Sequence, residues 1–159
     1  MDLDYMKGLI KGKIAEMIFQ EMFKQTGKFL IIPTGYEYNL PELAQYQNNL
    51  QNQNVISSIR TEPDFLLLTH GKNNERQAYF VEVKYREEIN PIDLIEISKK
   101  LLEHWNPCWL FVASGDGFYF SPCHAVINSQ GKIEKLTENW VKKEIQDKGL
   151  KVLQEYIKK

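Results

Sequence analysis

Apolar residues recur three or four positions apart in two long segments of the chain, which predicts two amphipathic helices. The first segment runs from about Asp4 to Gln25 and stops at Thr26-Gly27. The second opens with Pro91, whose fixed φ suits the first position of a helix, and ends at Asn106-Pro107. The spaced apolar residues are Ile10, Ile14, Met17, Ile18 and Met22 in the first helix, and Leu94, Ile95, Leu101, Leu102 and Trp105 in the second.

Short runs rich in β-branched, aromatic and leucine residues predict strands over residues 29–32, 64–68, 78–83 and 109–112. The second and third runs flank a polar turn, residues 71–76, and are expected to form an antiparallel hairpin. Gly115-Asp116-Gly117 permits a tight turn into a further strand at 118–120. Asn39 and Pro41 indicate another helix start, in a segment rich in Gln and Asn, and from Glu138 the pattern is again helical, with an interruption near Gly149.

The order of these elements is helix, three strands, helix and strand, followed by a hairpin and a helical extension. Such an order is typical of an α/β protein with a mixed sheet flanked by helices. The chain has 159 residues, of which 43% are apolar, so it can bury one core. We therefore expect a single domain over residues 1–159, with a core at about 4–113 and a C-terminal extension at 114–159.

The composition excludes several classes of protein. Lys and Arg number 20 against 21 Asp and Glu, so the chain as a whole lacks the positive field of a tight, non-specific nucleic-acid binder. No apolar run approaches the roughly 20 residues of a membrane span, and the first residues are acidic where a secretory signal is basic, so a cytoplasmic protein without membrane contact is expected. Cys108 and Cys123 are far apart in sequence, which argues against a zinc site and for reduced cysteines that serve packing.

One strand carries a possible chemical centre. Side chains alternate along Phe80-Val81-Glu82-Val83-Lys84, so Glu82 and Lys84 project to the same face. Asp64 begins the partner strand, and a suitable register, which the sequence leaves open, would bring its carboxylate beside Glu82. Two such carboxylates repel each other unless a cation lies between them, and Mg²⁺ prefers oxygen ligands of this kind.

Pro63-Asp64 followed by Glu82-Val83-Lys84 resembles the signature of the PD-(D/E)xK nucleases, which include restriction endonucleases and archaeal Holliday-junction resolvases. Gly12-Lys13-Ile14-Ala15-Glu16 is similar to the GxxAE motif on the first helix of the resolvases, with Gly27 at the helix end. The likeness spans roughly residues 4–113 and implies the restriction-endonuclease-like αβββαβ core.

What the resemblance implies is a Mg²⁺-dependent endonuclease, with Mn²⁺ as a substitute, that hydrolyses phosphodiester bonds of DNA and works as a homodimer. The resolvase-like helix hints at branched DNA. Asp64, Glu82 and the main-chain carbonyl of Val83 would bind the metal, Lys84 would be the catalytic lysine, and Glu16 would support a second ion or a water. A further polar residue on the following helix would be Ser98 or Lys99.

Other interpretations of the same residues remain open at the level of sequence. Glu82 and Lys84 can form an ordinary salt bridge on a solvated sheet face while Asp64 caps a turn. A helical wheel places Glu21, rather than Glu16, near the middle of the Ile10-Ile14-Met17 stripe. The chain can also be a binding or assembly module that keeps the nuclease fold without cutting, or its substrate can be RNA.

Aromatic and basic residues outside this centre also have two interpretations. Tyr85, Trp105 and Trp109 could stack on bases, but aromatic residues at helical or strand spacing are more often part of the core. The lysines of the last segment could touch phosphates or belong to a solvated helix face. These lysines are Lys142, Lys143, Lys148, Lys151, Lys158 and Lys159.

Overall fold

The computed structural model describes residues 2–34, 62–70 and 77–157. In chain order the elements are α1 (Leu3–Gln25), β1 (Phe29–Pro33), β2 (Phe65–Thr69), β3 (Ala78–Tyr85), α4 (Pro91–His104), β4 (Cys108–Ser114), β5 (Gly117–Pro122), α5 (Cys123–Asn128) and α6 (Lys143–Ile157). The predicted helices at 4–25 and from Pro91, and the five predicted strands, are confirmed. None of the helices in these ranges is long and apolar enough to cross a membrane.

Capping residues set the bounds of the two long helices that the sequence predicts. The Asp2 side chain accepts a hydrogen bond from the Asp4 N–H at the start of α1. Asn90 Oδ1 accepts from the Ile92 N–H at 2.9 Å, and Pro91 occupies the first turn of α4. Gly27, with φ of 70°, follows the end of α1 in a conformation that suits glycine.

The five strands form one mixed sheet in the order β1-β2-β3-β4-β5. β1, β2 and β3 pair antiparallel, β3 and β4 pair parallel, and β4 and β5 form an antiparallel hairpin closed at Ser114 and Gly117. The parallel pair needs a crossover, and α4 supplies it. The α/β class and the mixed sheet flanked by helices are therefore as predicted.

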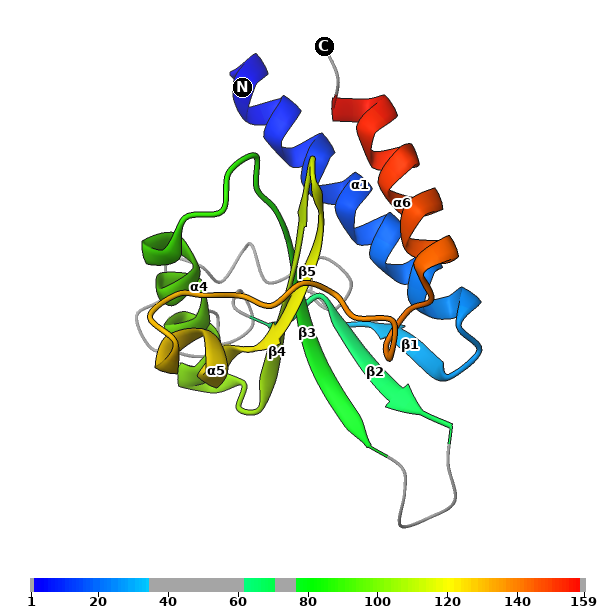
Figure 1. Cartoon of the computed structure of the whole chain (residues 1–159). Helices are drawn as coiled ribbons and strands as arrows, with labels where there is room; N and C mark the ends of the chain where they lie inside the picture. The colour runs from blue at the N-terminus through cyan, green and yellow to red at the C-terminus, as the bar shows by residue number, and fades with distance from the viewer. Residues whose placement is uncertain (1, 35–61, 71–76, 158–159) are drawn as a thin grey trace, which may run out of the picture.

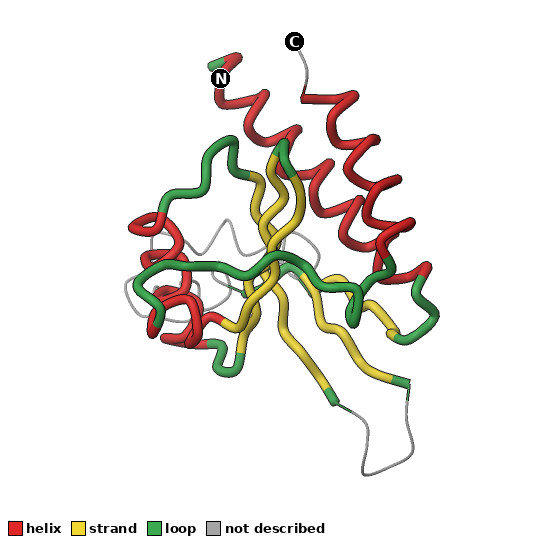
Figure 2. The backbone as a smooth tube through the Cα atoms, viewed as in Figure 1, coloured by secondary structure: helices red, strands yellow, loops and turns green. Residues whose placement is uncertain are grey.

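The helices form two layers, one on each side of the sheet (Figure 1). α1 and α6 lie side by side against one face, and α4 and α5 lie on the other, as the backbone trace also shows (Figure 2). The α4 side covers β3, β4 and β5, where Leu94, Leu110 and Val112 are buried together. Leu30, on the β1 part of the same face, is 51% exposed.

Aromatic rings fill the core between α1 and the sheet. The ring centroid of Phe19 lies 4.5 Å from that of Phe23, 4.9 Å from that of Phe111 and 5.1 Å from that of Phe65. Phe19 is fully buried, so one side chain of α1 joins the helix to both β2 and β4. This contact fixes α1 against the two strands that flank β3.

The C-terminal extension differs from its prediction in three ways. α6 begins at Lys143 rather than at Glu138, α5 was not predicted, and Gly149 does not interrupt α6. Gly149 lies where α6 meets α1, because a Cβ at this position would come within 2.6 Å of Met22 Sδ. The glycine therefore serves close helix packing. The predicted helix start at Asn39 and Pro41 and the turn at 71–76 lie outside the described residues.

Candidate active site

Asp64 lies one residue before β2, at the position opposite Glu82 of β3. Phe65 pairs with Val81, so the next pair along the antiparallel strands is 64 and 82. The Asp64 side chain continues the ladder at this point, since the Val83 N–H donates to Asp64 Oδ2 at 2.8 Å. Phe65 is buried under α1, so Asp64 belongs to the opposite face of the sheet. The register that the sequence leaves open thus brings Asp64 beside Glu82.

Glu82 and Lys84 project from β3 to the same face as Asp64. The alternate residues Val81 and Val83 are buried under α1, as strand geometry requires. Lys84 Nζ lies 3.2 Å from Glu82 Oε2, and the two side chains are 33% and 14% exposed, respectively. The acid is therefore largely withdrawn from water, while the amine reaches the surface.

The Glu82 carboxyl group is in an unfavourable place for a negative charge. Burial and the neighbouring Asp64 carboxylate raise the pKa of Glu82 well above its usual value, and the Lys84 ammonium offsets only part of this effect. Among the described residues, Glu82 Oε1 is buried without a hydrogen-bond partner. Two adjacent acceptors of this kind become compatible when a proton or a cation lies between them.

We expect the stability of the metal-free protein to depend on the Glu82 proton. The folded chain holds this proton above pH 4.5, where the unfolded chain has lost it, so the free energy of unfolding falls as the pH rises toward the raised pKa of Glu82. Glu82→Gln removes this dependence, because the amide does not titrate. Denaturant unfolding at pH 5 and pH 8 in a chelator measures the difference between the two proteins. Glu96→Gln, a change at an exposed residue of α4, should keep the wild-type dependence of the free energy of unfolding on pH. If Glu82→Gln showed the same pH dependence as the wild type, this effect could not be assigned to Glu82.

A polar pocket of about 320 Å³ adjoins these residues, between β3 and α4. Arg86 Nε lies 2.6 Å from Asp93 Oδ2, which ties the end of β3 to the first turn of α4. The lining residues are Glu82, Lys84, Arg86, Asp93, Glu96, Ile97, Lys100 and Leu101. The pocket thus mixes three cations with three acids, and the cations can meet an anionic substrate.

Sequence reasoning missed Arg86 and Lys100. The signal was present, since Arg86 is two residues after Lys84 and one position past the end of β3, and Glu96 and Lys100 are four apart on one helix face. The two polar residues proposed on the helix, Ser98 and Lys99, do not line the pocket. Ser98 is fully buried beside Cys123, and Lys99 is exposed.

The structure also shows which faces of α1 carry its acidic residues. The buried side chains of α1 are Ala15, Ile18, Phe19, Met22 and Phe23, of which Ile18 and Met22 lie against Gly149 of α6, whereas Ile10 and Met17 are exposed. The stripe used for the helical wheel therefore does not mark the sheet side. Glu21 is exposed and accepts a hydrogen bond from Gln25 Nε2. Glu16 follows the fully buried Ala15, its side chain is 17% exposed, and it pairs with Lys13 at 3.7 Å.

The two cysteines, distant in sequence, are neighbours in the fold. Cys108 begins β4 and Cys123 follows β5, next to the pair formed by Trp109 and Pro122. Both are free and buried, in agreement with a packing role. The hydrogen bond with Cys123, together with burial, raises the pKa of Cys108, which disfavours a reactive thiolate there.

The three aromatic residues considered for base stacking, Tyr85, Trp105 and Trp109, are partly buried and pack against the core, as their spacing favours. Trp105 packs edge-on against Phe80 with ring centroids 5.4 Å apart, and Trp109 lies within the aromatic cluster over β5. Tyr85 is half-buried and carries Lys11 Nζ over its ring at 5.6 Å. Lys142, Lys143, Lys148 and Lys151 are exposed, and Lys158 and Lys159 lie outside the described residues.

A divalent cation fits the donors that the site offers. Asp64 and Glu82 supply carboxylate oxygens, one of them buried without a donor, and the carbonyl of Val83 belongs to the same stretch of β3. Over residues 2–34, 62–70 and 77–157, no group of three His, Cys, Asp or Glu side chains gathers around one point, so most of the coordination shell would be water, as Mg²⁺ allows.

Comparisons of this chain with protein-family models, curated proteins and solved structures gave no match.

Proposed function

We propose that this chain is a metal-dependent endonuclease of the PD-(D/E)xK type that hydrolyses phosphodiester bonds of DNA. One observation carries the proposal: Asp64 and Glu82 meet on one face of the sheet, with the Lys84 amine 3.2 Å from Glu82. The order α1, β1, β2, β3, α4, β4 supports it, because it agrees with the αβββαβ core that the motif implies. In the alternative interpretation Asp64 caps a turn, whereas in the structure it accepts a hydrogen bond from the Val83 N–H of β3.

Mg²⁺ or Mn²⁺ would be held by Asp64, Glu82 and the Val83 carbonyl. When bound, the ion supplies Lewis acidity toward the phosphodiester and makes water a better nucleophile at neutral pH. A bound cation would also stabilise the ionised form of Glu82 in its buried position, because an opposite charge lowers the free energy of the carboxylate. Glu16, next to the buried Ala15, is the candidate for a second ion or a water.

Lys84 serves the substrate in this proposal. Its ammonium group is held by Glu82 and one third exposed, so it can donate hydrogen bonds toward the open side of the site. There it orients the attacking water and stabilises the additional negative charge on the phosphorus oxygens. Arg86 and Lys100 line the adjoining pocket and supply further donors for phosphate groups of the strand.

The affinity for the metal tests the site directly. We expect calorimetry with Mn²⁺ to show binding to the wild-type chain and at least a tenfold weaker affinity for Asp64→Asn, because loss of a ligand or of its support weakens metal sites by roughly 10- to 100-fold. The asparagine keeps an oxygen that accepts the hydrogen bond from the Val83 N–H, so the sheet is conserved.

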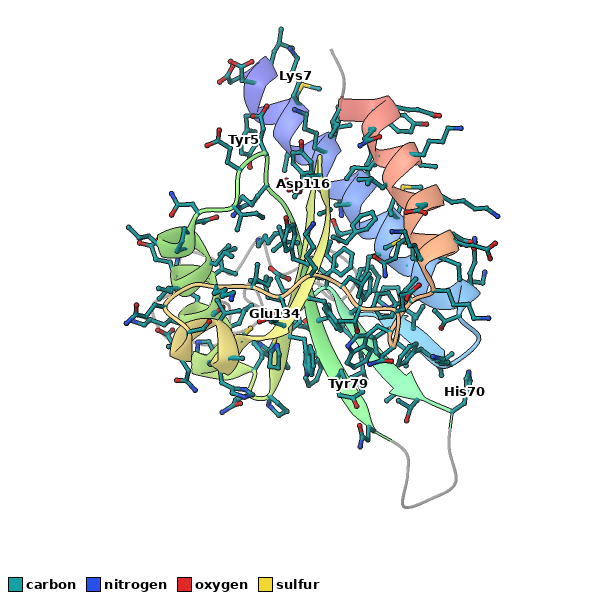
Figure 3. All side chains as sticks on the ribbon, viewed as in Figure 1. Tyr5, Lys7, His70, Tyr79, Asp116 and Glu134 are labelled. Carbon is teal, nitrogen blue, oxygen red and sulfur yellow. The ribbon has the colours of Figure 1, made fainter. Side chains whose placement is uncertain are left out.

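A matched variant is Asp116→Asn, which alters an exposed acid at the tip of the β4-β5 hairpin (Figure 3). It should bind Mn²⁺ as the wild type does. Equal affinities of all three proteins would exclude Asp64 as a ligand. Binding without cleavage of DNA plasmid or of a matched RNA would leave a non-catalytic module, and cleavage of RNA alone would change the substrate.

A further inference from the structure

The sheet face that carries Asp64 and Glu82 continues onto β1 and β2 as an apolar surface. Leu66 follows Asp64 by two residues in an extended stretch, so the two side chains lie on the same face. The strand register adds the neighbours of Leu66 and Leu68 on the adjoining strands. We call this surface the apolar shelf, and it consists of Leu30 and Ile32 on β1, Leu66 and Leu68 on β2, and Phe80 on β3.

The apolar shelf is open to solvent, although its side chains are those of a protein core. Leu30 is 51% exposed and Ile32 36%, and the other three residues are half-buried. α4 lies beside β3 and β4 and away from β1 (Figure 1), and the cluster buried beneath it takes its strand residues from β4. Apolar groups that are left together at the surface beside a polar site indicate that a ligand binds there.

One face of β3 joins the apolar shelf to the proposed metal site and to the cationic pocket. Phe80, Glu82 and Lys84 succeed each other at intervals of two residues, or about 7 Å. The pocket lined by Lys84, Arg86 and Lys100 lies at the other end of this row, between β3 and α4. The acids are therefore flanked by an apolar surface on one side and by cations on the other.

The cations are too few to hold a DNA duplex by its phosphates. Affinity for duplex DNA comes largely from phosphate contacts, commonly about six to ten of them. The pocket offers three cations, one of which, Arg86, is already paired with Asp93 at 2.6 Å. The whole chain has a net charge of −1, so long-range attraction adds little. Contacts with the bases must therefore supply a large part of the affinity.

An unpaired strand can use both sides of the site. In a duplex the faces of the bases are stacked inside the double helix, whereas in a single strand they are free to contact aromatic and apolar side chains. Phe80 supplies a ring on the apolar shelf, and Trp105 packs edge-on against this ring with centroids 5.4 Å apart. Single-strand binding sites commonly combine such a platform with cations that follow the backbone.

We propose that the apolar shelf binds the bases of single-stranded DNA, while the phosphates of the same strand lie at the metal site and at Lys84 and Lys100. The preferred substrate is then an unpaired strand rather than an uninterrupted duplex. The inference rests on the proposed nuclease function, because the metal site determines where the scissile phosphate lies.

Binding measured in a chelator tests the apolar shelf apart from the chemistry. Fluorescence anisotropy with a labelled oligo(dT) of about 20 nucleotides, longer than the roughly 4 to 16 that such sites cover, should show at least tenfold tighter binding than a duplex of the same length. A plot of the logarithm of the association constant against that of the salt concentration should have a slope no steeper than about −2, because three phosphate contacts contribute about 0.7 each. A slope of about −4 or steeper would indicate six or more contacts and contradict the proposal.

Variants of the two exposed β1 residues test the shelf itself. Leu30→Ala combined with Ile32→Ala should raise the dissociation constant for oligo(dT) about tenfold, and leave the affinities for the duplex and for Mn²⁺ unchanged. Leu30→Trp should tighten binding of oligo(dT) about fivefold or more, because the added ring stacks on a base, a gain that a purely structural role of Leu30 does not produce. Val152→Ala, at an exposed residue of α6 on the opposite side of the sheet, should bind as the wild type does. Circular dichroism checks that each variant is folded.

Cleavage separates this inference from the proposed function. With Mg²⁺, the wild type should cut single-stranded circular DNA at least tenfold faster than a relaxed duplex circle of the same sequence. Equal affinities for oligo(dT) and the duplex, or unchanged binding in the double variant, would overturn the inference even if plasmid nicking depends on Lys84. Tighter binding of RNA than of DNA of the same sequence would overturn the assignment to DNA. Single-strand binding that depends on the shelf, without metal-dependent cleavage, would support the shelf and overturn the proposed function instead.

Discussion

Lys84→Ala should lower metal-dependent nicking of plasmid DNA by about 10²- to 10⁴-fold, the range that removal of a positioned proton donor or charge stabiliser produces. Lys84 is one third exposed, and Glu82, whose pKa burial raises, can hold a proton when the ammonium is removed, so the loss should leave the fold intact. The rate is measured as conversion of supercoiled to open-circular plasmid in Mg²⁺ and in Mn²⁺.

Lys99→Ala is the matched control, because this lysine is exposed on α4 outside the lining of the pocket. It should nick plasmid at the wild-type rate. Equal rates for Lys84→Ala and the wild type would mean that a contaminating nuclease is responsible, whereas a loss in both variants would point to general charge rather than to the site.

Phe19→Ala should lower the free energy of unfolding by about 3 to 5 kcal/mol, as other truncations of buried aromatic residues do. The ring is fully buried and meets Phe23, Phe65 and Phe111, so its removal leaves a cavity between α1 and two strands. Denaturant unfolding at constant pH measures the loss, which is a large part of the roughly 5 to 15 kcal/mol of a typical domain.

Leu30→Ala provides a comparison on the same sheet. This side chain is 51% exposed, so its truncation should cost about 1 kcal/mol or less. If Phe19→Ala were no more destabilising than Leu30→Ala, the aromatic cluster would not be the core that holds α1 to the sheet.

Much of the fold follows from local sequence. Helix starts such as Asn90-Pro91 and the two-glycine turn at Gly115-Asp116-Gly117 act over a few residues, so their effects can be predicted without knowledge of the tertiary structure. Alternation along β3 likewise fixes that Glu82 and Lys84 share a face. These predictions needed no contact between distant segments.

The remaining features depend on packing. α1 has two apolar faces, one toward the sheet and one toward α6, and a helical wheel cannot tell which face meets which partner. The role of Gly149 also depends on packing, because the close approach of Met22 on α1 explains why a glycine lies inside α6. The register of Asp64 depends on the whole hairpin. The spacing of Glu96 and Lys100 puts both on one helix face, but only the position of α4 beside β3 shows that this face lines the pocket.

The hydrogen bond from the Val83 N–H to Asp64 makes this backbone amide sensitive to the binding of a cation at the site. The carboxylate of Asp64 that would face the cation also accepts this hydrogen bond. Binding of a cation at one carboxylate oxygen therefore changes the electron density at the other. The ¹⁵N resonance of Val83 should therefore move during a titration with Mg²⁺. Occupancy of the centre could in this way be followed from the backbone, without a substrate and without catalysis.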